Sequence, residues 1–193
     1  MNIHEMLPKT ELNCPDGLEV VVLGGGCFWC TEAVFLRVEG VKGVIPGYAG
    51  GFVEHPSYDA ICTGRTGHAE VIQVIFDPKQ IGLETLLAVF WATHDPTTLN
   101  RQGADAGPQY RSAIFYLSDK QEKLASEMME KLNQSKEFSD PIVTEITAFS
   151  NFYPAENYHK NYYMRNEGQP YCQFVVRPKV EKLQRLFEDK LKA

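Results

Sequence analysis

Two cysteines, Cys27 and Cys30, flank two aromatic residues directly after a glycine-rich turn, in the segment VVVLGGGCFWCTEAVF that starts at Val20. A thiol is a strong nucleophile only as the thiolate, and the free amides and dipole of a helix's first turn lower a cysteine pKa. Cys27 occupies that turn if the residues after it form a helix, so we expect its pKa to be lowered toward neutrality. The three glycines let the chain turn sharply and leave room for a substrate to reach the sulfur.

One carboxyl group interrupts a later apolar strand pattern, at Glu70 in HAEVIQVIF. A carboxyl that is partly buried among apolar groups keeps its proton to higher pH, which suits an acid that donates to a departing oxygen. The alternative is that Glu70 faces solvent at the start of the strand. The sequence alone leaves these two interpretations open.

Several other chemistries use similar residues. A dinucleotide fingerprint requires a third glycine where this chain has Trp29, which excludes that site. Zinc needs a second ligand pair that the sequence lacks, so we expect neither a metal nor another cofactor. Thiol–disulfide exchange through Cys27 and Cys30 stays open, as does a cysteine hydrolase with His68 or His94 as its base. A binding module that uses the aromatic C-terminal region is the non-enzymatic alternative.

The composition limits the cellular context. The net charge of −6 argues against nucleic acid as a partner, because such proteins need clustered basic residues. No apolar run approaches the roughly 18 residues that span a bilayer, and no basic start precedes an apolar stretch at the N-terminus. Five cysteines are too few for a secreted disulfide framework. We expect a monomeric, cytoplasmic protein with no membrane contact.

The elements that must position Cys27 and Glu70 follow the order β-α-β-β-α-β-α-β. This order predicts an α+β two-layer sandwich, with a mixed or antiparallel sheet, a ferredoxin-like βαββαβ core and a long irregular C-terminal tail. We expect one domain over 1–193, with an N-terminal arm at 1–17 and a wrapping tail at 149–193. The predicted strands are Leu18–Leu23, Val41–Tyr48, His68–Phe76, 112–118 and Pro141–Ala148, and the predicted helices are about three turns after Cys27, Leu83–Thr93, Asp119–Asn133 with Ser118 as N-cap, and Val180–Leu191. The aperiodic loop 94–111 between them is long enough to indicate a function.

Five sequence blocks together resemble the A-type peptide methionine sulfoxide reductases. In chain order the blocks are GGGCFWCTE, GYAGG, HPSYDAICTGRTGHAEVIQVIFDP, HDPTTLNRQGADAGPQYRSAIFY and AENYHKNYY. The resemblance implies Cys27 as the nucleophile and Glu70 as the acid. It also implies the following site residues: Phe28 and Trp29 for the substrate methyl group, and Tyr58, Tyr110 and Asp105 for the sulfoxide oxygen and water. It implies an α+β fold and activity on the S epimer in peptides and proteins, with free methionine sulfoxide left open.

The same resemblance implies protein repair through a cysteine sulfenic acid that a second thiol converts to a disulfide. Thioredoxin would then reduce this disulfide. Cys172, in a tail that looks flexible, and Cys30, one helical turn from Cys27, are both candidates for the resolving thiol, and we favour Cys172 as the first partner. Cys62 is expected to be buried, and Cys14 has no evident role.

Overall fold

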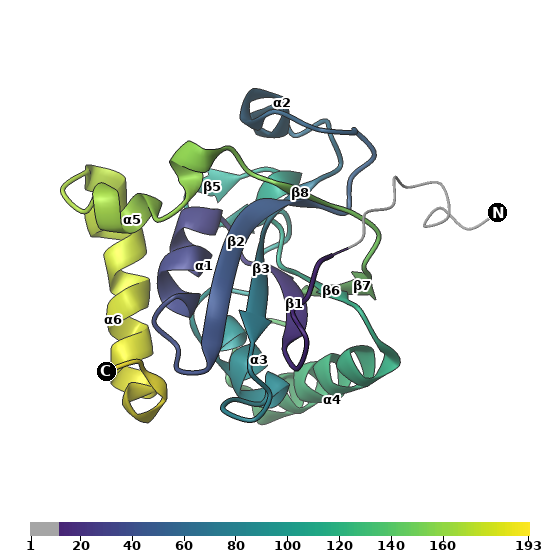
Figure 1. Cartoon of the computed structure of the whole chain (residues 1–193), viewed down its shortest axis with the longest axis vertical. Helices are drawn as coiled ribbons and strands as arrows, with labels where there is room; N and C mark the ends of the chain where they lie inside the picture. Colours follow the sequence, from purple (N-terminus) through teal and green to yellow (C-terminus); the bar gives the residue numbers. More distant parts are fainter. Residues whose placement is uncertain (1–11) are drawn as a thin grey trace.

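The computed structural model describes residues 12–193 and shows an α+β fold around a mixed six-stranded sheet (Figure 1). The strand order is β7-β6-β1-β3-β2-β8, in which β6 and β7 are parallel and the other neighbours are antiparallel. The strands are β1 (Glu19–Gly24), β2 (Val41–Ala49), β3 (Ala69–Phe76), β6 (Ala113–Tyr116), β7 (Glu145–Ala148) and β8 (Phe152–Pro154). Most of the N-terminal arm predicted for residues 1–17 lies outside the described residues.

The helices α1, α3 and α4 lie close to their predicted positions. The helices are α1 (Phe28–Phe35), α2 (Tyr58–Cys62), α3 (Leu83–Ala92), α4 (Asp119–Ser135), α5 (Tyr162–Arg165) and α6 (Arg177–Leu186). Ser118 is the N-cap of α4, as predicted, and its hydroxyl accepts a hydrogen bond from the Gln121 N–H at 3.2 Å. α1 has two turns rather than three, because the chain leaves the helix before it pairs Val38 with Leu191.

The alternation of side chains along the strands divides the core between the two faces of the sheet. Val21 and Leu23 of β1 face the large cluster that also contains the apolar side chains of α1 and α3. Val22, between them, faces a smaller cluster with Phe115 and Phe152 on the other side of the sheet. The helical face therefore holds most of the buried apolar surface and fixes α1 against the sheet.

The glycine turn carries the chain from β1 into α1 and sets the position of Cys27. Gly26 has a φ of +87°, which L residues with a side chain rarely adopt. A Cβ at this position would also approach Gln102 Cγ to 2.6 Å. Gln102 belongs to β4 (Arg101–Gln102), which pairs with β5 (Asp105–Ala106) as a small separate hairpin. The absence of a side chain at Gly26 thus lets this hairpin pack beside Cys27.

The structure differs from the sequence prediction mainly where short or irregular elements occur. The predicted loop 94–111 contains the β4–β5 hairpin and a 3₁₀ turn, and the predicted strand Pro141–Ala148 shortens to β7. β8 was not predicted, and it extends the sheet by pairing with β2. The last helix begins at Arg177 and is preceded by a π-helical turn at Cys172–Val176.

The C-terminal region lies against the body of the protein on the side of α1 (Figure 1). α5 and α6 contact α1, and Val176 and Leu183 belong to the same apolar cluster as the α1 side chains. This region consists mainly of short or irregular elements, as predicted, and part of its apolar side chains are packed, whereas Met164 and Phe174 are exposed. Within residues 12–193, no helix combines the length and apolar character needed to cross a membrane.

Candidate active site

Cys27 and Glu70 meet where the first turn of α1 passes over β3. Cys27 is the N-cap of α1, and Glu70 is the second residue of β3. The Phe28 N–H, one of the free amides of the helix start, donates to Glu70 Oε2 at 3.1 Å. Both residues are buried, since Cys27 is 7% exposed and Glu70 is 1% exposed. The interpretation of Glu70 as a solvent-facing carboxylate is therefore wrong.

The prediction of a lowered Cys27 pKa is also wrong. Burial raises the pKa of the Cys27 thiol well above its usual range, and the Cys30 thiol and the Glu70 carboxyl raise it further. A hydrogen bond from the Trp29 N–H favours the thiolate but does not offset these effects. The helix start is in the predicted place, but its Phe28 amide points to Glu70 and not to the sulfur.

Glu70 has the properties of an acid that is protonated near neutral pH. Burial raises its pKa to about 8, against opposing hydrogen bonds from the Phe28 N–H and the Cys27 thiol. Asp105 and Cys30 raise the pKa further through their negative charge. The carboxyl can therefore hold a proton beside the sulfur at a pH where an exposed glutamate is ionised.

Cys30 lies one turn after Cys27 and interacts with it directly. A hydrogen bond from the Cys27 thiol lowers the pKa of Cys30, and the positive charge of Lys179 acts in the same direction. The Tyr171 hydroxyl is 3.9 Å from the Cys30 sulfur and donates to Asp105 Oδ2 at 2.7 Å. Asp105, in β5, is thus connected to the cysteine pair through Tyr171, a residue that the sequence analysis did not single out.

The other three cysteines have different surroundings. Cys172 is fully buried in the π-helical turn, although Phe174 in the same turn is exposed. Its pKa is raised first by burial and then by the charge of Cys30, and both cysteines belong to the same apolar cluster. Cys62 is exposed at the end of α2, because in this short surface helix only Ile61 points inward. The prediction that Cys62 is buried is wrong, and Cys14 is also exposed.

Tyr58 and Tyr110 face the same group of charges from two different segments. Tyr58 opens α2, whose N-cap Ser57 accepts a hydrogen bond from the Ala60 N–H, and Tyr110 ends the 3₁₀ turn Pro108–Tyr110. Burial raises the pKa of both phenols far above the usual range, and the nearby charge of Glu70 is the second cause for each. Both hydroxyls therefore remain protonated and can donate hydrogen bonds.

The two aromatic residues after Cys27 have different exposures. The Phe28 ring is fully buried and packs against Tyr48 and His159, with ring centroids 5.7 and 4.9 Å apart. Trp29 is partly exposed, and its indole stacks on Tyr162 with centroids 3.6 Å apart and planes 5° from parallel. Trp29 is therefore accessible in part, with one face covered by Tyr162, while Phe28 is enclosed.

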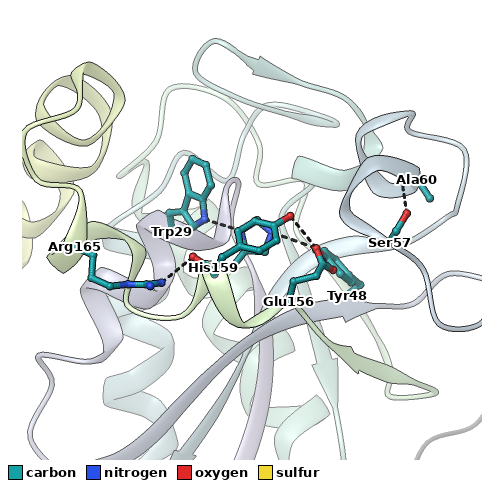
Figure 2. Close-up of polar contacts among 8 residues, drawn as sticks. Trp29, Tyr48, Ser57, Ala60, Glu156, His159 and Arg165 are labelled. Carbon is teal, nitrogen blue, oxygen red and sulfur yellow. Dashed lines mark hydrogen bonds and ion pairs between the residues drawn. The ribbon is translucent and has the colours of Figure 1, made fainter.

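A hydrogen-bonded network at the edge of the site was missed by the sequence analysis (Figure 2). The Trp29 Nε1–H donates to His159 Nδ1 at 3.0 Å, and His159 Nε2 lies 3.5 Å from Glu156 Oε2. The Tyr48 hydroxyl donates to Glu156 Oε1 at 3.3 Å. The segment AENYHKNYY contained both Glu156 and His159, but its irregular pattern gave no indication of which side chains turn inward.

The two histidines considered as hydrolase bases are engaged elsewhere. His94 binds the Phe90 carbonyl and Ser112 Oγ, and burial lowers its pKa to about 3. His68 accepts from the Gly51 N–H at 3.0 Å, and its other ring nitrogen is 2.7 Å from the Val53 carbonyl. Neither ring is a hydrogen-bond partner of Cys27, so the structure gives no support to a hydrolase. In the stretch from 12 to 193, no group of three or more histidines, cysteines or acidic residues is arranged to hold a metal ion.

Comparisons with known proteins identify the family. The family profile described as peptide methionine sulfoxide reductase matches residues 19–191. The chain belongs to the peptide methionine sulfoxide reductase family. Its similarity to a Rhodopirellula baltica peptide methionine sulfoxide reductase, MsrA 1, is 54% identity over 182 residues, which is 94% of each chain. The resemblance carried by the sequence blocks is thereby confirmed, and the chain is a methionine sulfoxide reductase of the A type.

Solved structures of this reductase family have the same fold. Reduced Saccharomyces cerevisiae Mxr1 superposes with a TM-score of 0.76 and 36% identity, over 86% of this chain and 96% of that chain. Mxr1 in complex with Trx2 gives a TM-score of 0.54 with 28% identity, over 81% of this chain and 93% of that chain. The α+β architecture is therefore that of the family, and one relative has been captured with its thioredoxin.

Proposed function

We propose that Cys27 attacks the sulfur of a methionine-S-sulfoxide side chain in a peptide or protein while Glu70 protonates the sulfoxide oxygen. Cys27 loses its thiol proton as its sulfur bonds to the substrate sulfur. The S–O bond then breaks as the hydroxyl passes to the Cys27 sulfur, and the bond between the two sulfurs breaks, which leaves Cys27 as a sulfenic acid and methionine as the thioether. The proton from the thiol restores the acid form of Glu70. The observation that carries this mechanism is the buried, protonated Glu70 carboxyl beside the Cys27 sulfur. Without the proton, charge that develops on the oxygen would make it a poor leaving group.

The surrounding residues would stabilise and position the reacting groups. The Tyr58 and Tyr110 hydroxyls, which stay protonated, are proposed to donate to the sulfoxide oxygen where negative charge develops. Asp105 is proposed to order Tyr171 and nearby water around the cysteines. Trp29 and Phe28 would receive the methyl group of the substrate, and the partial exposure of Trp29 directly after Cys27 supports this role.

For the resolving step we propose a relay in which Cys30 acts before Cys172. Residues three apart on a helix have Cβ atoms about 5–6 Å apart, more than the roughly 3.5–4.5 Å of a disulfide, so a Cys27–Cys30 disulfide needs a small shift of Cys27, which as N-cap lies outside the helical backbone. Lys179 and the Tyr171 hydroxyl lower the pKa of Cys30 independently of the Cys27 thiol and favour its thiolate, which would attack the Cys27 sulfenic acid, forming a disulfide and releasing water. Cys172, in the same apolar cluster as Cys30, would then exchange with this disulfide. This order differs from the initial preference for Cys172 as first partner.

An external dithiol of the thioredoxin type is proposed to take the final disulfide, which restores the thiols and oxidises the dithiol. The Mxr1–Trx2 complex supports this assignment. All five cysteines are free in the structure, which suits a reducing compartment such as the cytoplasm. We retain the monomer as a prediction, and we propose a single domain over the whole chain.

We also propose that the centre of the sheet is a ferredoxin-like core. The elements β1, α1, β2, β3, α3 and β6 follow the order βαββαβ, with α2 and the β4–β5 hairpin inserted. Their strands are adjacent in the antiparallel order β6-β1-β3-β2. This arrangement brings the first turn of α1 over β3, and it supports the role assigned to Glu70.

The proposed cycle is tested by one turnover without reductant, using peptides that contain either the S or the R sulfoxide. The reduced chain should convert the sulfoxide to methionine in the S peptide only, and the Cys27→Ser variant should convert neither peptide. Mass spectrometry should find the Cys27–Cys30 disulfide in Cys172→Ser and a Cys30–Cys172 disulfide in the unmodified chain. Direct pairing of Cys27 with Cys172 in the unmodified chain, with none through Cys30, would contradict the relay but not the reductase.

A further inference from the structure

An exposed aromatic side chain, Tyr158, lies beside the proposed active site and has no role in the mechanism above. Tyr158 belongs to the 3₁₀ turn Asn157–His159 and is 54% exposed. We propose that Tyr158 is a specificity-determining residue, whose ring binds a cationic side chain next to the methionine sulfoxide of a peptide substrate. The inference rests on the proposed function and deepens it, because it names the class of peptide that the same site prefers.

The first argument is the position of Tyr158 relative to the reacting groups. Its ring meets the ring of Tyr58 edge-on, with the centroids 6.5 Å apart and an angle of 84° between the planes. Tyr58 is proposed to donate to the sulfoxide oxygen, so Tyr158 lies one ring contact away from the reaction. Successive Cα atoms of a peptide are about 3.8 Å apart, so the side chain next to the sulfoxide residue can reach the Tyr158 ring.

The second argument is that part of the Tyr158 ring is open to a ligand. The His159 ring packs against it on one side, with the centroids 4.1 Å apart. The Arg165 guanidinium donates to the Tyr158 carbonyl at 2.8 Å, so it binds the backbone and not the ring. In the described part of the chain, the one cation that lies over an aromatic ring is Arg37, over Tyr163. The exposed part of the Tyr158 ring therefore has no cation from these residues.

The third argument is the negative charge beside the ring. The Tyr158 hydroxyl donates to Glu156 Oε2 at 3.1 Å, and Asp59 is an exposed residue of α2, directly after Tyr58. Burial raises the pKa of Tyr158, and the hydrogen bond to Glu156 and the charges of Glu156 and Asp59 raise it further. A cation on the ring would thus be attracted by the π face and by two carboxylates, whereas an acidic side chain would be repelled.

The strength of such a contact suits discrimination between peptides. An exposed cation–π contact corresponds to about a twofold to fivefold gain in affinity, and exposed ion pairs are similarly weak. A free cation or a separate partner protein would therefore not stay bound to Tyr158 alone. A side chain on a peptide whose sulfoxide residue is already in the site loses little further freedom, so the gain is expressed in kcat/KM. Arginine should be preferred to lysine, because its planar guanidinium stacks on aromatic faces.

Peptides that differ in one residue beside the methionine-S-sulfoxide test the proposal. Arginine, glutamine or glutamate is placed directly before or directly after the sulfoxide residue, and kcat/KM is measured with a small dithiol as the reductant. For at least one of these two positions, kcat/KM of the arginine peptide should exceed that of the glutamine peptide about threefold to tenfold. The glutamate peptide should fall below the glutamine peptide. The arginine preference should shrink with added NaCl, because the Asp59 carboxylate is exposed to solvent.

Three substitutions separate the ring, its hydroxyl and the charge beside it. Tyr158→Leu removes the aromatic face and should reduce the arginine-to-glutamine ratio of kcat/KM to below about twofold, with little change for the glutamine peptide. Tyr158→Phe keeps the face and loses only the contact with Glu156, so it should keep most of the ratio. Asp59→Asn should lower the ratio about twofold. The matched control is Asp189→Asn, which removes one charge near the C-terminus, at the opposite end of the molecule from α2 (Figure 1).

The outcomes distinguish this inference from the proposed function. If the unmodified chain reduces none of the peptides, the proposed function fails. If it reduces the arginine, glutamine and glutamate peptides equally well at both positions, only the specificity is overturned. A full arginine preference in Tyr158→Leu would also overturn the role of Tyr158, even if Asp59→Asn lowered the preference, because the charge alone would then explain it. Should Tyr158→Leu not fold, Tyr158→Gln replaces it, since glutamine also lacks the aromatic face, and the same loss of preference is expected.

Discussion

Replacement of Glu70 with glutamine should remove most of the reductase activity while leaving the fold intact. Glutamine keeps an oxygen that can accept from the Phe28 N–H, which donates to Glu70 at 3.1 Å, but it has no acidic proton. With a pKa raised to about 8, roughly 90% of Glu70 is protonated at pH 7, against roughly 0.3% for a carboxyl at the ordinary value of 4.5. The protein environment thus increases the acid form about 300-fold.

The expected loss follows from the role of the proton. Positioned general acids contribute typically about 10²–10⁴-fold, so the first-turnover rate of Glu70→Gln at pH 7 should fall within this range. The assay mixes reduced protein with excess S-sulfoxide peptide, without reductant, and measures the reduced, methionine-containing peptide formed per protein against time. Glu32→Gln is the matched control, since Glu32 is also buried, at 2% exposure, but its carboxylate accepts from the Asn161 N–H rather than facing Cys27.

Two results would refute this reasoning. One is a Glu70→Gln rate within a few fold of the unmodified rate, which would mean that another group protonates the oxygen. The other is a rate for the unmodified chain that rises, rather than falls, as Glu70 ionises through pH 8. Ionisation of Cys27, whose pKa is also raised, would itself make the first-turnover rate rise with pH. The dependence of this rate on pH is therefore measured for both the unmodified chain and Glu70→Gln. The part of the dependence that is absent from Glu70→Gln is assigned to Glu70.

Three further outcomes are expected. Glu70→Gln should have a higher free energy of unfolding in urea than the unmodified chain at pH 8.5, but not at pH 4. The Glu70 pKa is about 8 in the folded chain and 4.5 in the unfolded chain, so the unmodified chain loses unfolding free energy as the pH rises from 4.5 through 8. The upper limit of this loss is about 5 kcal/mol. Equal differences at both pH values would contradict the shift. Tyr171→Phe should slow disulfide formation several-fold, because the Tyr171 hydroxyl lies 3.9 Å from the Cys30 sulfur. The first conversion of sulfoxide to methionine should be unchanged. Rapid-quench sampling with a count of free thiols measures both steps. Ser118→Ala should lower unfolding free energy by about 1 kcal/mol through loss of the α4 cap, seen as a urea-midpoint shift without loss of activity.

The core of the site could be predicted from the sequence because it depends on local patterns. The apolar run before Gly26 and the helical spacing after it place Cys27 at a helix N-cap, and the structure has it there. The alternation in β3 placed Glu70 at the second position of a strand. Strand pairing then brings the two residues together, since Glu70 lies opposite Tyr48 on the sheet face that α1 covers.

The protonation state of Cys27 and the burial of Cys62 and His159 could not be predicted from local sequence patterns. The expected shift of the Cys27 pKa depended on the helix start alone, whereas burial by segments far along the chain decides its sign. Cys62 follows the buried Ile61 in the sequence, but α2 is a single short surface helix that turns the thiol outward. His159 is buried by packing against Phe28, 131 positions earlier in the chain, and no local periodicity marks such a contact.

The raised pKa values of Cys27 and Glu70 have one common physical origin. Burial is the first cause for each group, because removal of water disfavours both the thiolate and the carboxylate. In the proposed mechanism, the Cys27 thiol gives up its proton as it attacks, and the Glu70 proton neutralises the charge that builds on the sulfoxide oxygen. The reacting atoms therefore carry charge only while the proton of Glu70 is being transferred. The first step should therefore depend little on ionic strength, because no long-lived charge is exposed to salt.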